Sequence, residues 1–106
     1  MTDKELLELA ARAAGIAWVR HAENTECASL LLKKGGWWNP LTDDGDALRL
    51  AVKLELSLDL FDFAITCGYP ANGEGNELDE PVVGDPYAAT RRAIVRAAAE
   101  IGKEMK

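Results

Sequence analysis

Residues 56–67 have the sequence Leu56-Ser57-Leu58-Asp59-Leu60-Phe61-Asp62-Phe63-Ala64-Ile65-Thr66-Cys67. The first half alternates leucine with a polar residue, which is the period of a strand with one face in solvent. In the second half, from Phe61 to Cys67, the apolar residues move to the opposite parity. A bulge or a turn near Leu60 would reconcile the two halves. The segment therefore predicts either one bulged strand or two short strands.

A helix is predicted before this segment, from an N-cap at Thr42 or Asp43 to about residue 55. Pro40 disfavours helix at the residue before it. Aspartates fill the first turn, where the helix dipole favours negative charge. This role explains them better than a calcium loop, whose regular spacing is missing. The expected buried face of the helix consists of Ala47, Leu48, Ala51, Val52 and Leu54.

Residues 68–80 are rich in glycine, proline and asparagine, which predicts an exposed loop. Its acidic residues, expected to be solvated, are Glu74, Glu77, Asp79 and Glu80. An edge strand is predicted over residues 77–83, limited by Pro81. The longest helix then begins with Asp85 as N-cap and Pro86 at its first position. Its expected apolar stripe consists of Tyr87, Ile94, Ala98, Ile101 and Met105.

A third helix is predicted near the start of the sequence, over residues 3–14. Thr2 and Glu5 have the spacing of a capping box, and Gly15 is a natural end. The segments after it are predicted as extended chain over residues 16–21, a loop over 22–29, and either a short strand or irregular structure over 30–32.

Three helices and three or four strands in 106 residues predict a single α/β domain of the α+β type, spanning residues 1–106. The expected architecture is a compact α-β-α sandwich, in which three helices cover a small, mostly antiparallel sheet. The sequence has no apolar run of the ~20 residues that a membrane-spanning helix needs, and its first residues lack a secretion signal. A cytoplasmic protein with no membrane partner is therefore expected.

The formal charge of the chain is −6, from 18 acidic and 12 basic residues. Such a chain repels nucleic acid unless its basic side chains gather on one face, so direct nucleic-acid binding is not expected. Arg91, Arg92 and Arg96 are interpreted as a solvated face with intramolecular ion pairs rather than as a nucleic-acid contact.

Catalytic and metal-binding patterns are sparse. The chain has one histidine, His21, which excludes a histidine metal cluster. Cys27 and Cys67 are too far apart to signal a zinc site or a disulfide framework, and they are interpreted as buried or half-buried thiols. A nucleophile pair of His21 with either cysteine stays open, although neither cysteine lies at an evident helix N-terminus, where the thiolate is favoured. The sequence predicts a protein that is not an enzyme and holds no metal or cofactor.

The most informative stretch for binding is Lys33-Lys34-Gly35-Gly36-Trp37-Trp38-Asn39-Pro40. Lysines supply charge, glycines allow a close backbone approach and tryptophans stack on rings, so the stretch could hold a phosphorylated, base-containing ligand. The candidate binding residues are Lys33, Lys34, Trp37, Trp38 and Asn39. In the alternative interpretation, adjacent side chains of an extended chain point to opposite faces, so that one tryptophan fills the core and the lysines are solvated.

Three segments carry a resemblance to a known family. They are Glu5-Leu6-Leu7-Glu8-Leu9-Ala10, Trp38-Asn39-Pro40-Leu41 with Asp43-Asp44-Gly45-Asp46-Ala47-Leu48-Arg49-Leu50-Ala51-Val52, and Asp85-Pro86-Tyr87-Ala88-Ala89-Thr90-Arg91-Arg92-Ala93-Ile94-Val95-Arg96-Ala97-Ala98-Ala99-Glu100-Ile101-Gly102. Over nearly its whole length the chain resembles a family of small phage and prophage proteins, an α-β-α sandwich domain of unknown function. The resemblance implies the fold and a phage or prophage origin, and it carries over no catalytic or binding residue. The chain departs most from the family pattern over residues 61–75, which hold more apolar residues than expected.

Two hypotheses about function follow. In the first, the protein is a non-catalytic phage or prophage accessory protein that binds a host protein, for example as a stoichiometric inhibitor of a defence system such as CRISPR. This step is an analogy from the implied origin. In the second, the protein binds a small, nucleotide-like ligand beside residues 33–38. A homodimer formed through an exposed tryptophan or the edge strand over residues 77–83 also stays open.

Overall fold

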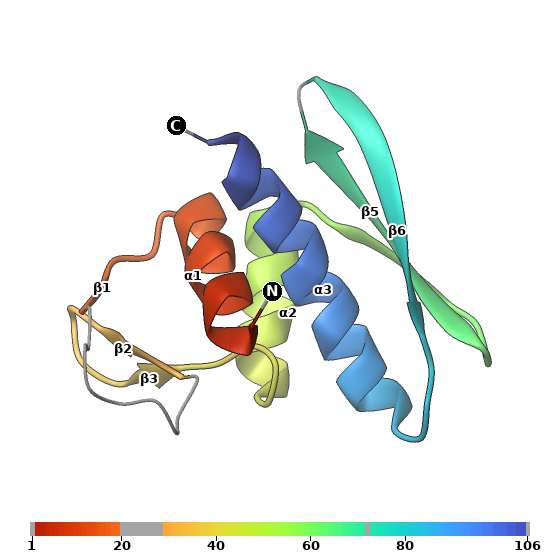
Figure 1. The fold of residues 1–106 in the computed structure, drawn as a ribbon, viewed down its shortest axis with the longest axis horizontal. Coiled ribbons are helices and arrows are strands. Elements are labelled where there is room, and N and C mark those ends of the chain that lie inside the picture. The colour runs from red at the N-terminus through yellow and green to blue at the C-terminus, as the bar shows by residue number, and fades with distance from the viewer. Residues whose placement is uncertain (1, 20–28, 72, 106) are drawn as a thin grey trace.

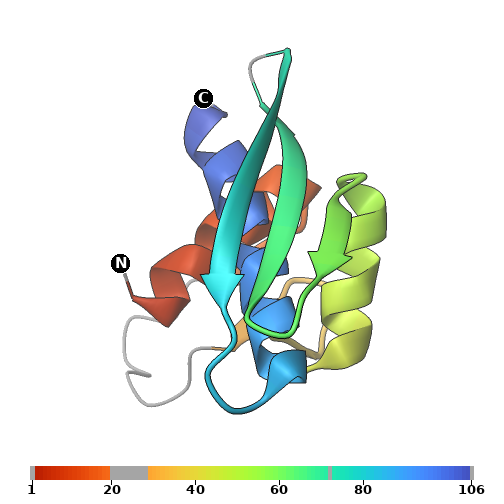
Figure 2. The ribbon, with the colours of Figure 1, turned by 90° about the vertical axis from the view of Figure 1, so that its right-hand side faces the viewer.

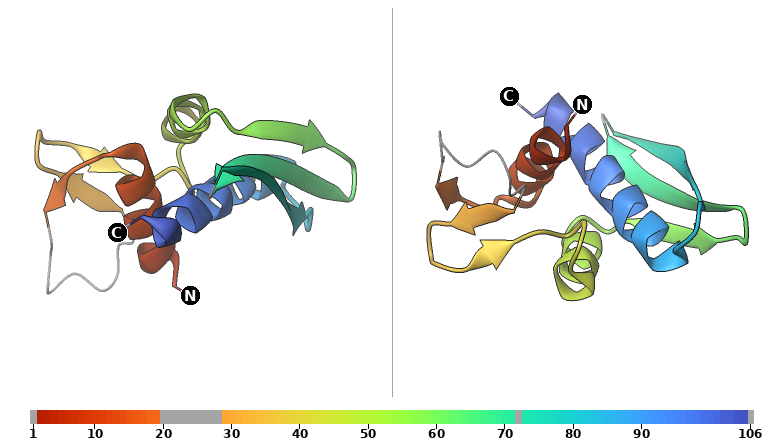
Figure 3. Two further views of the ribbon diagram at one scale, coloured as in Figure 1. Left: turned by 90° about the horizontal axis from the view of Figure 1, so that it is seen from above. Right: turned by 60° about the horizontal axis from the view of Figure 1, so that its bottom comes forward.

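The computed structural model describes residues 2–19, 29–71 and 73–105. Within them the elements are α1 (Asp3–Ala14), β1 (Trp18–Val19), β2 (Leu30–Leu32), β3 (Trp37–Trp38), α2 (Asp44–Lys53), β4 (Ser57–Leu60), β5 (Ala64–Ala71), β6 (Glu74–Pro81) and α3 (Pro86–Glu104) (Figure 1). The strands form two antiparallel sheets, β1-β2-β3 and β4-β5-β6, and the helices lie between them (Figure 3). The α+β class with three helices and antiparallel strands is confirmed, although the strands form two sheets rather than one.

The last helix, α3, lies between α1 and the β4–β6 sheet (Figure 1). Its side toward β5 carries Ala89, Ala93 and Ala97, which are spaced four residues apart and pack with Ile65 and Cys67. Its other buried side packs with α1 and α2, and its residues Ile94, Val95, Ala98 and Ala99 belong to the same hydrophobic cluster as residues of the β1–β3 sheet. Small side chains on both sides let α3 approach its neighbours closely, so one helix joins two hydrophobic clusters.

Gly102 marks a point of close contact between α3 and α1. The residue is buried, and a Cβ atom built on it would overlap the backbone carbonyl of Leu9. The two helix backbones can lie against each other here because residue 102 has no side chain.

Three arginines of α3 form ion pairs with three different elements. The pairs are Arg91–Asp44 on α2 (2.7 Å), Arg92–Asp3 on α1 (3.2 Å) and Arg96–Glu80 on β6 (2.7 Å). The interpretation of these arginines as intramolecular ion pairs is confirmed. Each pair is partly exposed and contributes little stability, but together they orient α3 relative to its neighbours.

The helix starts follow the predicted capping chemistry. The hydroxyl of Thr2 accepts a hydrogen bond from the N–H of Glu5, whose carboxylate in turn accepts from Thr2. These hydrogen bonds lower the pKa of Glu5. Gly15 ends α1 with a φ of 71°, and Asp43 and Asp85 cap α2 and α3 through their side chains.

The β1–β3 sheet contains parts of the segments predicted between the first two helices. Strand β1 covers two of the residues predicted as extended chain over 16–21, whereas residues 30–32 are a strand and not irregular structure. Residues 20–28, which contain His21, Cys27 and most of the predicted loop, lie outside the described residues.

The segment of residues 56–67 contains two strands, the second of the two predicted alternatives. Strand β4 pairs with β5 in the register Leu58↔Cys67 and Leu60↔Ile65. The chain reverses between them, where the N–H of Phe61 donates to the carbonyl of Ala64 at 3.0 Å.

The prediction of a loop over residues 68–80 is wrong, because β5 and β6 form a hairpin there. Gly68, one of the glycines that suggest a turn, lies within β5. A Cβ atom at this position would overlap the hydroxyl of Ser57 on the paired strand β4, so glycine is needed here for strand packing. The predicted edge strand exists and ends at Pro81, but it begins at Glu74 instead of residue 77. The acidic residues assigned to the loop lie on β6, where Asp79 accepts a hydrogen bond from Thr66 at 2.7 Å.

Two predicted apolar faces are partly wrong. On α2, Leu48 and Val52 are 64% and 69% exposed, and the residues that reach the core are Ala47, Leu50 and Ala51. On α3, Tyr87 is 69% exposed, and Met105 beyond its end is also exposed. The reason is position: α2 and the two ends of α3 lie at the margin of the molecule, so only one narrow side of each is covered (Figure 3).

Cys67 is a free cysteine buried under α3, as predicted. Burial raises the pKa of its thiol from 9.0 to about 11, because the charged thiolate is disfavoured away from water. At pH 8 the native thiol is therefore almost entirely protonated and shielded.

We expect Cys67 to resist a thiol-specific reagent at pH 8 until the protein unfolds, measured in a Cys27→Ser variant so that one thiol is followed. In the unfolded chain the Cys67 thiol ionises near pH 9, whereas in the native protein it ionises near pH 11. The free energy of unfolding should therefore fall as the pH rises from about 9 toward 11. Fast labelling of the native protein at pH 8 would contradict the burial of this side chain.

Candidate functional site

The lysine–glycine stretch forms the turn between β2 and β3. Gly35 and Gly36 have φ values of 100° and 85°, and the N–H of Gly35 donates to the carbonyl of Leu32 at 2.9 Å. A Cβ on either glycine would meet no atom within 4 Å. The two glycines are therefore explained by the backbone conformation of the turn, without any need for a close approach by a ligand.

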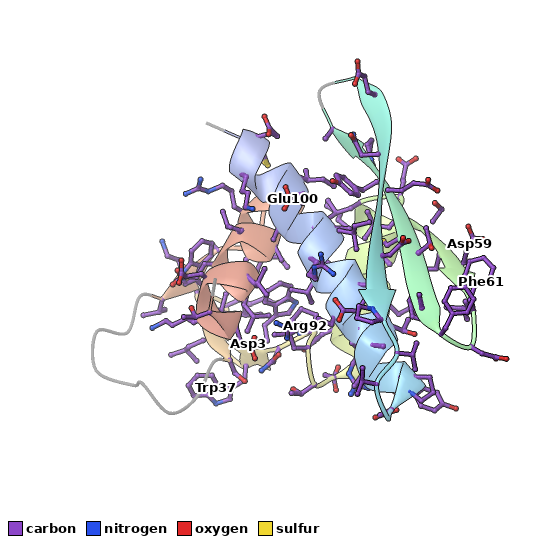
Figure 4. All side chains as sticks on the ribbon, turned by 45° about the vertical axis from the view of Figure 1, so that its right-hand side comes forward. Asp3, Trp37, Asp59, Phe61, Arg92 and Glu100 are labelled. Atoms are coloured by element: carbon purple, nitrogen blue, oxygen red, sulfur yellow. The ribbon has the colours of Figure 1, made fainter. Side chains whose placement is uncertain are left out.

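Trp37 and Trp38 point to opposite faces of β3, as predicted. Trp38 is 5% exposed and packs in the cluster that includes Leu7 of α1 and Leu50 of α2. Trp37 is 57% exposed (Figure 4). Trp38 is therefore a core residue, and Trp37 is a surface residue.

A cleft of about 830 Å³ lies between the β2–β3 turn and α2, and we call it the basic cleft. Its lining includes four of the five predicted binding residues: Lys33, Lys34, Trp37 and Trp38. From α2 it gains Arg49 and Lys53, which the sequence analysis missed. These two are four residues apart and so share a helix face, but nothing in the sequence shows that this face lies opposite the turn.

Asn39, the fifth predicted binding residue, is not in the lining of the basic cleft. Its side-chain oxygen accepts from the N–H of Leu41, and its amide donates to Ser29, both at 3.0 Å. Its backbone N–H donates to Asp46, also at 3.0 Å. These hydrogen bonds of Asn39 fix the conformation of the chain segment that leads into α2.

A second depression, of about 680 Å³, is lined by residues of α2, β4 and the start of α3, and we call it the apolar groove. Figure 2 shows the ribbon of α2 beside β4, with the start of α3 below them. Its outer lining includes Leu48, Leu60, Phe61 and Tyr87, each at least half exposed. The buried side chains of Ile65 and Ile94 lie deeper in the same lining.

The turn between β4 and β5 carries two phenylalanines into solvent. Phe61 lines the apolar groove, and Phe63 is 74% exposed. Their rings stack with centroids 5.7 Å apart and planes inclined by 22°. Phe61 and Trp37 lie at opposite ends of the molecule, so the groove and the basic cleft are separate sites (Figure 4).

The margin of the apolar groove is acidic. Asp44 and Asp62 contribute to its lining. One basic side chain, Arg91, is also among the described lining residues. The Arg91 guanidinium is held by Asp44 at 2.7 Å and by the carbonyl of Leu41 at 2.9 Å, so the carboxylate of Asp62 leaves the described lining net negative.

The chain matches no protein-family model, no curated protein and no solved structure. None of the described helices is long and apolar enough to cross a membrane. Among the described residues, no group of three or more histidine, cysteine, aspartate or glutamate residues is placed to hold a metal ion. The cleft and the groove are therefore interpreted from their own chemistry.

The sequence patterns place Leu48 and Tyr87 on buried faces, so they do not predict the apolar groove. One signal was present in the sequence. Phe61 and Phe63 flank an aspartate at the point where the strand alternation breaks, which is a turn rather than a strand interior. Two phenylalanines in a turn cannot both reach a core, so they indicate an exposed aromatic surface.

Proposed function

We propose that the protein is a non-catalytic binding protein that docks a host protein in the apolar groove. The observation that carries this proposal is the exposure of Leu48, Leu60, Phe61 and Tyr87 around one depression. Soluble proteins rarely leave a large contiguous apolar patch in water, and a patch with a polar margin is typical of an interaction site. Aromatic side chains that lose water on binding are the usual centres of binding energy.

The chemistry of the groove favours a partner segment that is both apolar and basic. Apolar side chains would fill the depression, and lysine or arginine would face Asp62 at its margin. A net charge of −6 on the whole chain accelerates encounter with a basic partner and disfavours an acidic one. A second copy of this chain fits poorly, because two acidic margins would meet at the contact.

The resemblance to phage and prophage proteins supports a host protein as the partner. The corresponding role is stoichiometric inhibition of that host protein, for example a component of a defence system such as CRISPR. This part of the proposal rests on analogy from the implied origin, while the apolar groove supplies the contact surface.

Site-specific photo-crosslinking tests the proposal. A benzophenone amino acid replaces Phe63, which is 74% exposed and stacks on Phe61. In bacterial cells we expect cross-linking to one host protein at a fixed stoichiometry. The same group at Glu77, an exposed position on β6, is the matched control and should not capture that protein.

A Leu60→Asp variant should abolish the cross-link from position 63, because a carboxylate in the groove opposes apolar docking. Its stability should change by no more than about 0.5 kcal/mol, since Leu60 is 67% exposed. Equal capture from positions 63 and 77, or products formed only between copies of the chain, would contradict the proposal.

A further inference from the structure

We propose that the basic cleft binds a free phosphorylated nucleoside, independently of the apolar groove. The phosphates would face the lysines of the β2–β3 turn and of α2, and the base would stack on Trp37. The proposal rests on the charge in the cleft, on how that charge is compensated, and on the exposed ring beside it.

Basic side chains are in excess in the cleft, although acidic residues are in excess in the chain as a whole. Four basic residues and one acidic residue are among its described lining, whereas the whole chain has 12 basic and 18 acidic residues. Lys33, Lys34 and Lys53 form no ion pair with any other residue that the structure describes. Ammonium groups that share one concave surface repel each other, and an anionic ligand removes that cost.

The one acidic residue of the cleft does not neutralise these lysines. Asp46 lies 2.7 Å from the guanidinium of Arg49 and also accepts the N–H of Asn39 at 3.0 Å. Its charge is thus matched by Arg49, which it holds in place on α2. Among the residues that the structure describes, no ion pair compensates the charge of the three lysines that line the cleft.

The exposed ring and the size of the cleft define the rest of the ligand. Trp37 is 57% exposed and borders the same cleft as Lys33 and Lys34. An indole face stacks well on a nucleobase. A volume of about 830 Å³ lies within the range of small-molecule sites.

A free nucleotide fits this surface better than a nucleic-acid strand does. The described lining of the cleft is net positive, whereas the whole chain has a net charge of −6. A strand continues beyond the cleft, and its further phosphates meet the net negative field of the rest of the protein. A mononucleotide ends inside the cleft and avoids that repulsion.

Isothermal titration at about 0.15 M salt, where distant charges are screened, tests the inference with three probes: ATP, inorganic triphosphate and a short single-stranded oligonucleotide. We expect ATP to bind with one site per chain. Lys33→Glu and Lys53→Glu should each weaken ATP at least about tenfold. Trp37→Ala should weaken ATP similarly but leave triphosphate binding unchanged, because only ATP carries a ring.

Lys103→Glu is the matched control, since it changes the net charge equally but lies outside the basic cleft. It should leave ATP binding within about twofold of wild type. No measurable ATP binding, an equal loss in Lys103→Glu, or binding of the oligonucleotide without ATP would each overturn the inference. The groove variant Leu60→Asp should bind ATP normally, so failure here is distinguishable from failure of the docking proposal.

Discussion

Trp38→Ala should lower the free energy of unfolding by about 3–5 kcal/mol, the usual cost of removing a buried tryptophan. Trp38 is 5% exposed and packs in the cluster that joins β3 with α1, α2 and α3. Its removal leaves a cavity among Leu7, Leu50 and their neighbours, whose backbones are fixed by helices and can close it only in part. Urea unfolding followed by circular dichroism measures the loss.

Trp37→Ala is the matched comparison for this prediction. Because Trp37 is 57% exposed, the variant should lose no more than about 1 kcal/mol. A similar loss in both variants would contradict the assignment of one tryptophan to the core and the other to the surface. The distinction matters for binding assays, since loss of a ligand in Trp38→Ala would report unfolding and not a missing contact.

Gly102→Ala should destabilise the protein by about 1–3 kcal/mol, the range for overpacking, although alanine favours a helix over glycine by about 1 kcal/mol. The added Cβ would overlap the backbone carbonyl of Leu9, which belongs to α1 and cannot rotate away as a side chain can. The two helices must move apart at residue 102, and this weakens the packing between α1 and α3 on either side of that residue.

Gly45→Ala provides the control for this substitution in another helix. A Cβ at Gly45 would lie 3.2 Å from the guanidinium of Arg49 and from the carboxylate of Asp43. The Arg49 guanidinium can move away, and the Asp43 carboxylate, which caps α2, needs to shift by only a few tenths of an ångström, so we expect little change in the urea midpoint. An unchanged midpoint in Gly102→Ala would show that α1 and α3 are not in backbone contact at this residue.

The elements themselves could be predicted from local chemistry. Thr2 with Glu5, Asp43 and Asp85 each supply a cap within one turn of the helix they begin, so their effect is visible in a few residues of sequence. The division of residues 56–67 into two strands was likewise visible in the change of apolar parity.

Burial could not be predicted in the same way, because it depends on which elements cover a face. Leu48 and Ala47 are neighbours on α2, yet one is exposed and the other buried, since α3 covers a narrow side of that helix. The β5–β6 hairpin was missed for a related reason. From the sequence alone, Gly68 indicates a turn. Its role in packing against Ser57 follows only from the pairing of β4 and β5.

The candidate site was predicted in part. The stretch around Lys33 and Trp37 was found because charge, glycine and tryptophan lie together in sequence. Arg49 and Lys53 were not found, since they join the basic cleft through the packing of α2 against the β2–β3 turn. The same holds for the apolar groove, whose residues come from α2, β4 and α3.

The central place of α3 has a consequence for how the chain folds during synthesis. Ribosomes add the other helices and both sheets before α3, yet both hydrophobic clusters require its side chains. Partners such as Asp3 and Arg92 are 89 residues apart, so the decisive contacts have high contact order. Until α3 emerges, the side of α1 that packs against it stays in water, where chaperones and proteases can reach it.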